Sequence, residues 1–96
     1  MKKRIFVAGK WSSRTVDNAF ISVEAEVRKQ KGDDVEVLLP YNLTNKDADW
    51  QTSERIDIAT LASCDELHMT REWQSKEANL LRDIAMRLDM NIVYHN

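Results

Sequence analysis

Four short, mostly apolar runs alternate with three stretches of helical periodicity, and this alternation constrains the fold more than any other feature. The runs are Ile5–Ala8, Val35–Leu39, Leu67–Met69 and Asn91–Tyr94. A short apolar run without a polar face is typical of a strand buried on both sides. Each run is separated from the next by enough residues for a helix. The sequence therefore predicts four strands connected by three helices.

The three intervening stretches carry apolar residues at three- and four-residue steps, which indicates amphipathic helices. The first runs over 15–31 and is expected to stop at Gly32. The second follows a polar, turn-rich loop over 41–49, and either Thr52 or Ser53 is placed to cap it. The third is expected to begin at Ser75.

The order β-α-β-α-β-α-β implies a parallel sheet with crossover helices on both faces. We expect a single α/β domain over 1–96, a three-layer flavodoxin- or Rossmann-like sandwich with strand order 2-1-3-4. Ligands of such folds bind beyond the strand carboxyl ends, where the strand order reverses. That position lies between the first and third strands, where the segments 9–14 and 70–75 are expected to meet.

Charge and composition exclude several classes of protein. The formal net charge of −2 argues against a dedicated nucleic-acid binder. The sequence has neither an apolar run long enough for a bilayer nor a recognisable signal peptide, so no membrane association is expected. The single cysteine, Cys64, suits a reducing compartment, and we expect a cytoplasmic protein in which this thiol is buried and inert.

The loop after the first strand offers groups that suit a phosphorylated ligand. Gly9 permits a tight turn, Lys10 brings positive charge, and Ser12 brings a hydroxyl near a helix start. Trp11 offers an aromatic platform for a base or a sugar. The alternative is that a serine caps the helix and the other side chains are solvated.

The loop after the third strand supplies Trp73 and the helix-capping Ser75 as further candidates for ligand contact. Three carboxylates are expected near the mouth and are weak candidates for acid chemistry: Asp65, Glu72 and Glu77. Glu77 is also explained by the helix dipole, which favours an acid in the first turn. His68 is expected to be a satisfied core histidine and His95 to be exposed, and no metal-ligand spacing is present.

With these residues in place, the chain resembles the nucleoside 2-deoxyribosyltransferase-like family, especially its small uncharacterised members in phage and bacterial genomes. The resemblance is carried by four segments in order. They are the opening strand and glycine at 4–9, the turn into the second strand at 32–37 with Pro40, the helix-to-strand passage with Asp57, Leu61, Cys64 and Asp65, and the helix with Trp73, Ser75, Ala78 and Ala85.

The resemblance implies a nucleoside or nucleoside monophosphate site in which a glutamate attacks the anomeric carbon and a tyrosine positions it. This sequence departs from that pattern. Phe6 stands in the place of the tyrosine and Leu81 in the place of the nucleophile. Glu77 replaces a glycine that lets phosphate approach the helix, and Lys10 replaces a proline. Whether the chain is an enzyme is therefore open.

Three functions remain. The preferred one is a degenerate, non-catalytic protein that binds a nucleotide or a ribosyl phosphate and uses no cofactor. The second is an active N-glycosidase or deoxyribosyltransferase with a relocated acid, Glu77 first and Glu72 or Asp65 behind it. The third is a ligand-free interaction module. A homodimer is expected from size and from apolar residues on several sides of the second helix. A phage gene would place the protein in the host cytoplasm.

Overall fold

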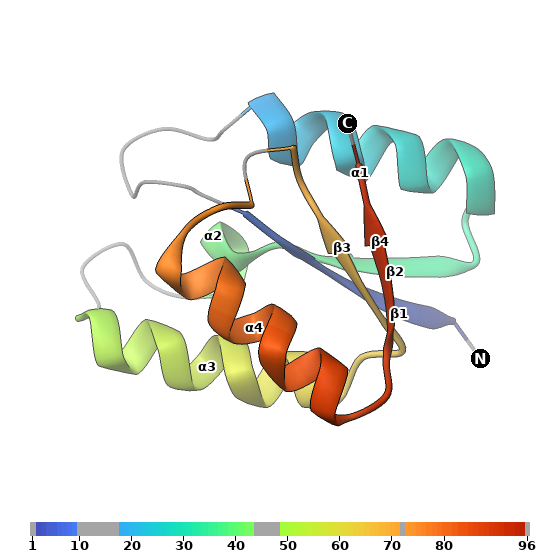
Figure 1. Cartoon of the computed structure of the whole chain (residues 1–96). Helices are drawn as coiled ribbons and strands as arrows, with labels where there is room; N and C mark the ends of the chain where they lie inside the picture. Colours follow the sequence, from blue (N-terminus) through green and yellow to red (C-terminus); the bar gives the residue numbers. More distant parts are fainter. Residues whose placement is uncertain (1, 10–17, 44–48, 72, 96) are drawn as a thin grey trace.

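The computed structural model describes residues 2–9, 18–43, 49–71 and 73–95, and it shows an α/β fold (Figure 1). The four predicted strands and three predicted helices occur in the predicted order, with one additional short helix before the second of them. The elements are β1 (Lys3–Ala8), α1 (Asn18–Lys31), β2 (Val35–Leu38), α2 (Pro40–Leu43), α3 (Trp50–Ala62), β3 (Glu66–Met69), α4 (Lys76–Arg87) and β4 (Asn91–Tyr94).

The four strands form one parallel sheet in the order β2-β1-β3-β4, which confirms the predicted topology. Ile5 of β1 pairs with Val37 of β2 on one side and with Glu66 of β3 on the other. Because all strands run the same way, their carboxyl ends share one edge of the sheet. The strand order reverses between β1 and β3 at that edge.

The sheet is the middle layer of three, with α1 on one face and α3 and α4 on the other (Figure 1). Successive side chains of β1 point to opposite faces and so enter two separate hydrophobic clusters. Ile5 and Val7 pack under α1 with residues such as Phe20. Phe6 and Ala8 pack with residues of α3 and α4. The central strand is consequently buried on both sides, as its unbroken apolar run predicts.

Two predicted boundaries are confirmed in detail. Gly32 ends α1 with a φ of 68°, a left-handed conformation that glycine adopts without strain. Ser75 precedes α4 in an extended conformation, and its side chain accepts a hydrogen bond from the Ala78 amide. Residues 15–17, which the predicted first helix included, lie outside the described part of the chain.

Two local predictions are wrong. Pro40–Leu43 forms the short helix α2, within the stretch expected to be strand end and loop, because proline suits the first position of a helix. The cap of α3 is Asp49, and neither Thr52 nor Ser53 takes that position. The Asp49 carboxylate accepts a hydrogen bond of 2.7 Å from the Thr52 amide, so the helix begins one turn earlier than expected.

Candidate functional site

The carboxyl ends of β1 and β3 meet at Gly9 and Thr70, the described ends of the two loops that we expected to converge. The Thr70 amide donates a hydrogen bond of 3.0 Å to the Ala8 carbonyl and so extends the pairing of the two strands. A β-carbon added at Gly9 would overlap the buried Thr70 hydroxyl. The close approach of these strands therefore requires glycine here, whether or not a ligand also uses the space.

Helix α4 begins beside this point and presents its amino end to the same edge of the sheet. The Ser75 hydroxyl accepts a hydrogen bond of 3.2 Å from the Ala78 amide, and the Ser75 amide donates one of 2.8 Å to the Trp73 carbonyl. Capping uses one lone pair of the hydroxyl and leaves its proton available to another acceptor. Ser75 can therefore cap the helix and contact a ligand at once.

Two carboxyl groups of α3 lie buried close to the start of α4. Only 7% of Glu54 and 6% of Asp57 is exposed. Burial, reinforced by the negative charge of Glu77 in the first turn of α4, raises the pKa of Glu54. Burial, reinforced by the charge of Glu54, raises the pKa of Asp57 from the ordinary 3.8 to about 7. The charge of Glu77 thus acts on Glu54 across the α3–α4 contact, and the charge of Glu54 acts in turn on Asp57.

The buried acids also have unused hydrogen-bonding capacity. Oε1 of Glu54 and Oδ1 of Asp57 are buried and have no hydrogen-bond partner among the described residues. A buried acceptor without a donor is costly, so such groups are rare in native structures. Perturbed carboxyl groups in this position can accept hydrogen bonds from sugar hydroxyls or transfer a proton near neutral pH.

Sequence reasoning missed this pair as site residues, although a signal was present. Glu54 and Asp57 are three residues apart and therefore share a face of α3. Leu61, one turn beyond Asp57, is fully buried, so that face points into the core. Acids that interrupt the buried face of an amphipathic helix are exceptional and could have been singled out on that ground.

Phe6 and Leu81, at the positions of the expected tyrosine and nucleophile, belong to one hydrophobic cluster. Phe6 is fully inaccessible and Leu81 is 2% exposed. The cluster lies between the sheet and the two helices and also contains Ala8, Ala78 and Ala85. Both positions that would carry polar chemistry are therefore occupied by close-packed hydrocarbon.

Trp73 is held by contacts with the protein. Its ring meets the edge of Tyr94 in a T-shaped arrangement with a centroid distance of 5.6 Å. The Arg82 guanidinium lies 5.1 Å from the same ring centroid. The half-buried indole thereby ties α4 to β4, which is a structural role for this candidate ligand residue.

Asp65 does not lie near the mouth, and the expectation that it does is wrong. Its amide donates a hydrogen bond of 2.8 Å to the Arg4 carbonyl, and its carboxylate accepts one of 2.8 Å from the Arg4 amide. Arg4 is near the start of β1, so Asp65 lies at the amino edge of the sheet, opposite Gly9 and Ser75. A residue just before a parallel strand must lie there. Lys10, Trp11, Ser12 and Glu72 lie outside the described residues.

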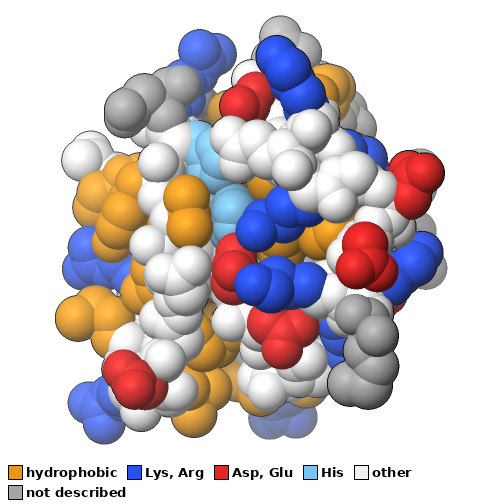
Figure 2. Space-filling model, turned by 90° about the vertical axis from the view of Figure 1, so that its right-hand side faces the viewer, with side chains coloured by type: hydrophobic (Ala, Val, Ile, Leu, Met, Phe, Trp, Pro, Cys, Tyr) orange, Lys and Arg blue, Asp and Glu red, His pale blue; other side chains and the backbone are white. Residues whose placement is uncertain are grey.

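The two histidines lie together on the α1 side of the sheet, and the expectation that His95 is exposed is wrong. His68 is 3% exposed and is hydrogen-bonded through both ring nitrogens, which confirms a satisfied core histidine. His95 is half-buried because its ring lies against that of His68, with a distance of 2.8 Å between His95 Nε2 and His68 Nδ1. Figure 2, which views the molecule from the right-hand side of Figure 1, shows histidine side chains together beside acidic and basic groups.

The predicted inertness of Cys64 agrees with its surroundings. The thiol is half-buried and donates a hydrogen bond of 3.2 Å to the Thr60 carbonyl. Burial raises the pKa of the thiol to about 11, which keeps it protonated at neutral pH.

Within the described ranges, no three His, Cys, Asp or Glu side chains come together as metal ligands would. The helices of those same ranges are all too short or too polar to cross a membrane.

The chain belongs to the family described as "Domain of unknown function (DUF4406)", whose model matches residues 3–94. No curated protein matches the sequence. The expected restriction to a phage and bacterial branch finds no support in these matches.

Among solved structures, the chain resembles the 2-desoxiribosyltransferase from Leishmania mexicana, with a TM-score of 0.66 and 19% sequence identity. The match covers 96% of this chain but 63% of the transferase, so this chain spans less than two thirds of that protein. The shared architecture confirms the predicted resemblance at the level of the fold.

Proposed function

We propose that this member of the DUF4406 family binds a nucleotide or a ribosyl phosphate at the carboxyl edge of the sheet without cleaving it. The observation that carries the proposal is the burial of Phe6 and Leu81 in one apolar cluster. Covalent cleavage of an N-glycosidic bond needs a nucleophile at the anomeric carbon. A packed leucine side chain cannot attack, and a phenylalanine cannot position an attacking group by hydrogen bonding.

The polar groups around the cluster support binding of the sugar. The unpartnered oxygens of Glu54 and Asp57 are acceptors for hydroxyl groups. Their charge, together with that of Glu77, opposes a phosphate at the same spot. We therefore place the sugar next to these acids and the phosphate toward the loop with Gly9, Lys10 and Ser12. Ser75 would lie between the sugar and the phosphate, and Trp11 or Trp73 would lie next to the base.

Calorimetric titration with deoxynucleoside monophosphates and with ribose 5-phosphate tests this function. Ser75→Ala should weaken binding about tenfold, since a hydrogen bond to a charged or strongly polar ligand is lost. Ser63→Ala, which removes a serine at the opposite edge of the sheet, is the matched control. Absence of binding by any of these compounds to the folded protein would leave the interaction module as the better reading.

A second function is favoured by the state of Asp57. A carboxyl with a pKa of about 7 is suited to donate a proton to a departing base at neutral pH. In this reading Asp57 or Glu77 is the relocated acid of an N-glycosidase. Release of free base from deoxynucleoside monophosphates by the wild type, abolished in Asp57→Asn, would establish it and overturn the non-catalytic proposal.

We also propose that the protein is a homodimer. Helix α4 and its C-cap expose apolar side chains that the fold does not cover: Leu80 at 39%, Met86 at 61% and the capping Leu88 at 52%. Exposed apolar groups on one element favour association with a second surface. Sedimentation velocity should show a dimer that Met86→Glu dissociates, whereas a wild-type monomer at high concentration would rule it out.

A further inference from the structure

A chain of four polar side chains crosses the α1 side of the sheet, apart from the acids of α3 and α4. Lys3 Nζ lies 2.9 Å from Glu66 Oε2, and Glu66 Oε1 lies 2.9 Å from His68 Nε2. His68 Nδ1 lies 2.8 Å from His95 Nε2. Glu66 and His68 are both buried, so this chain is built into the fold. It begins at the amino edge of the sheet and ends at His95, just beyond β4.

The hydrogen bonds fix where the protons lie. Glu66 accepts from Lys3, so its second oxygen accepts from His68 Nε2–H. The neutral His68 ring then has only a lone pair at Nδ1, which must accept a proton from His95 Nε2. Nδ1 of His95 is consequently a lone pair in the neutral state and becomes an N–H donor when the ring is protonated.

The ionised state of Glu66 supports this assignment. Burial alone would raise the pKa of Glu66, but hydrogen bonds from His68 and Lys3, with the charges of Lys31 and Lys3, lower it to about 2. A carboxylate that remains ionised next to His68 stabilises a positive charge on the histidine pair.

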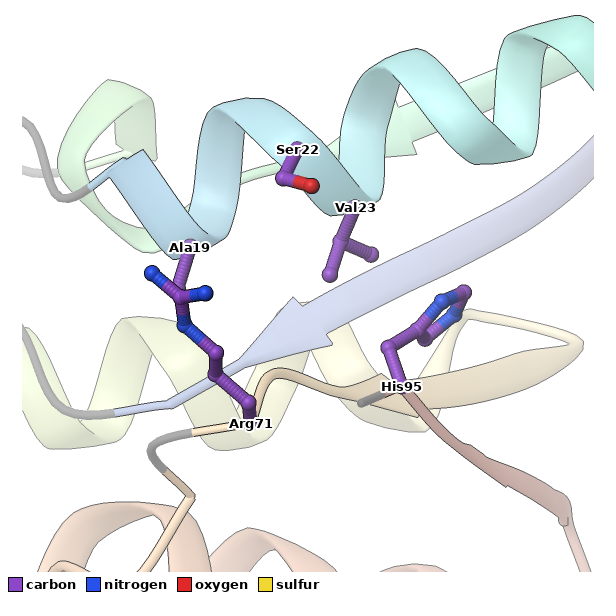
Figure 3. A pocket seen from close by; sticks show the side chains of 5 residues that line it. All are labelled: Ala19, Ser22, Val23, Arg71 and His95. Atoms are coloured by element: carbon purple, nitrogen blue, oxygen red, sulfur yellow. The ribbon is translucent and has the colours of Figure 1, made fainter.

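The chain ends in a pocket between α1 and the segments that follow β3 and β4. Its lining consists of Ala19, Ser22, Val23, Arg71 and His95. Figure 3 shows Arg71 reaching toward α1 beside Ala19 and the His95 ring beneath Val23. Arg71 has no ion-pair partner in the described part of the chain.

Charged groups face His95 from each element around the pocket. Burial and the neighbouring His68 lower the pKa of His95, and the negative charge of Glu26 on α1 opposes this shift. Arg71 approaches from the segment after β3. Behind His68 lies Glu66, and the positive charges of Lys31 and Lys3 act on its carboxylate.

We infer that this pocket binds a small tetrahedral oxyanion, held by the Arg71 guanidinium, the Ser22 hydroxyl and a protonated His95 whose proton is shared with His68. Arginine and imidazolium donors form short charge-assisted hydrogen bonds to such anions. Binding takes up one proton, which the Glu66 carboxylate stabilises through His68. This site is independent of the proposed nucleotide function and uses none of its residues.

Titration with sodium sulfate tests the inference, because sulfate keeps its charge between pH 5.5 and 8. Linkage requires that sulfate bind more tightly as pH falls. The dissociation constant for sulfate should rise by up to tenfold per pH unit in the range where His95 is neutral in the free protein. By the same linkage, sulfate must raise the pKa of His95, which imidazole NMR signals report directly. Ribose 5-phosphate in a parallel titration distinguishes a free inorganic anion from a phosphate monoester as the occupant.

Two variants locate the anion. Arg71→Ala and His95→Asn should each weaken sulfate binding about tenfold, and His95→Asn should remove the pH dependence. Arg55→Ala, which deletes an exposed arginine on the opposite face, should change neither. Sulfate binding that is absent, independent of pH, or unaffected by both pocket variants would overturn the inference. If a variant fails to fold, the His95 NMR signals of the wild-type protein still show whether sulfate raises the pKa of His95.

Discussion

Replacing Asp57 with asparagine should stabilise the protein at neutral and alkaline pH. The folded pKa of about 7 stands above the ordinary 3.8, so the native state resists ionisation of this carboxyl more than the unfolded chain does. Below pH 3.8 both states hold the proton and the group has no effect on stability. As pH rises from 3.8 to 7 only the unfolded chain releases the proton, so the free energy of unfolding falls.

The magnitude follows from the two pKa values. The full difference corresponds to about 4 kcal/mol of lost stability above pH 7. Between pH 5 and pH 8 the loss is about 2–3 kcal/mol, which is a large share of the stability of a small domain. Asparagine has nearly the same shape and never ionises, so the variant should lose this part of the pH dependence.

Urea denaturation of the wild type and Asp57→Asn at pH 5 and pH 8 measures the effect. The difference in unfolding free energy between the two proteins should grow by about 2–3 kcal/mol from the lower to the higher pH. Asp83→Asn, at an acid on α4 whose side chain is 63% exposed, is the control and should show no such growth. Equal pH dependence in the wild type and Asp57→Asn would refute the buried, proton-retaining state of Asp57.

Three further predictions concern other parts of the fold. Gly9→Ala should lower the free energy of unfolding, measured by heat or urea, by about 2 kcal/mol, since the new β-carbon overlaps the Thr70 side chain. Gly32→Ala should lower it by about 1 kcal/mol, because open space surrounds the site and only the φ of 68° opposes a side chain. A larger loss for Gly32→Ala than for Gly9→Ala would contradict the packing argument. Glu66 has a pKa of about 2 against an ordinary 4.5, so it contributes about 3 kcal/mol of stability above pH 4.5 that is lost as pH falls toward 2. Acid titration followed by circular dichroism should therefore show a shallower unfolding transition in Glu66→Gln than in the wild type. An unchanged curve would argue against the Lys3–Glu66–His68 contacts. Leu81→Glu combined with Phe6→Tyr should give slow release of base from a deoxynucleoside monophosphate if the proposed nucleotide site is otherwise intact. Chromatography of the products is the assay. Complete inactivity of a folded double variant would count against a preserved sugar site.

The local predictions that succeeded depended on strong short-range signals. Gly32 ends α1 and Ser75 caps α4 because each property is intrinsic to the residue and its immediate neighbours. The predicted cap of α3 is wrong because Asp49, Thr52 and Ser53 are all good caps, and only the backbone conformation decides among them.

The candidate site was predicted less completely than the fold. The approach of Gly9 to Thr70 follows from topology, yet the predicted position of Asp65 is wrong, because a residue directly before β3 must lie at the amino edge of a parallel sheet. The prediction omits the acids of α3 because exposed acids are common on helices, although their helical spacing with Leu61 indicates that Glu54 and Asp57 share the buried face.

The sequence by itself determined the elements and their order, because hydrophobic periodicity and the handedness of crossover connections leave few ways to bury these strands. It also determined that the positions of the expected nucleophile and tyrosine carry Leu81 and Phe6. Only the tertiary structure decided the chemistry of the acids and histidines. The pKa of Asp57 depends on how deeply the folded protein buries it beside Glu54, and the contact of His68 with His95 joins residues that are 27 positions apart. Neither the depth of burial nor that contact is encoded in a local pattern of residues.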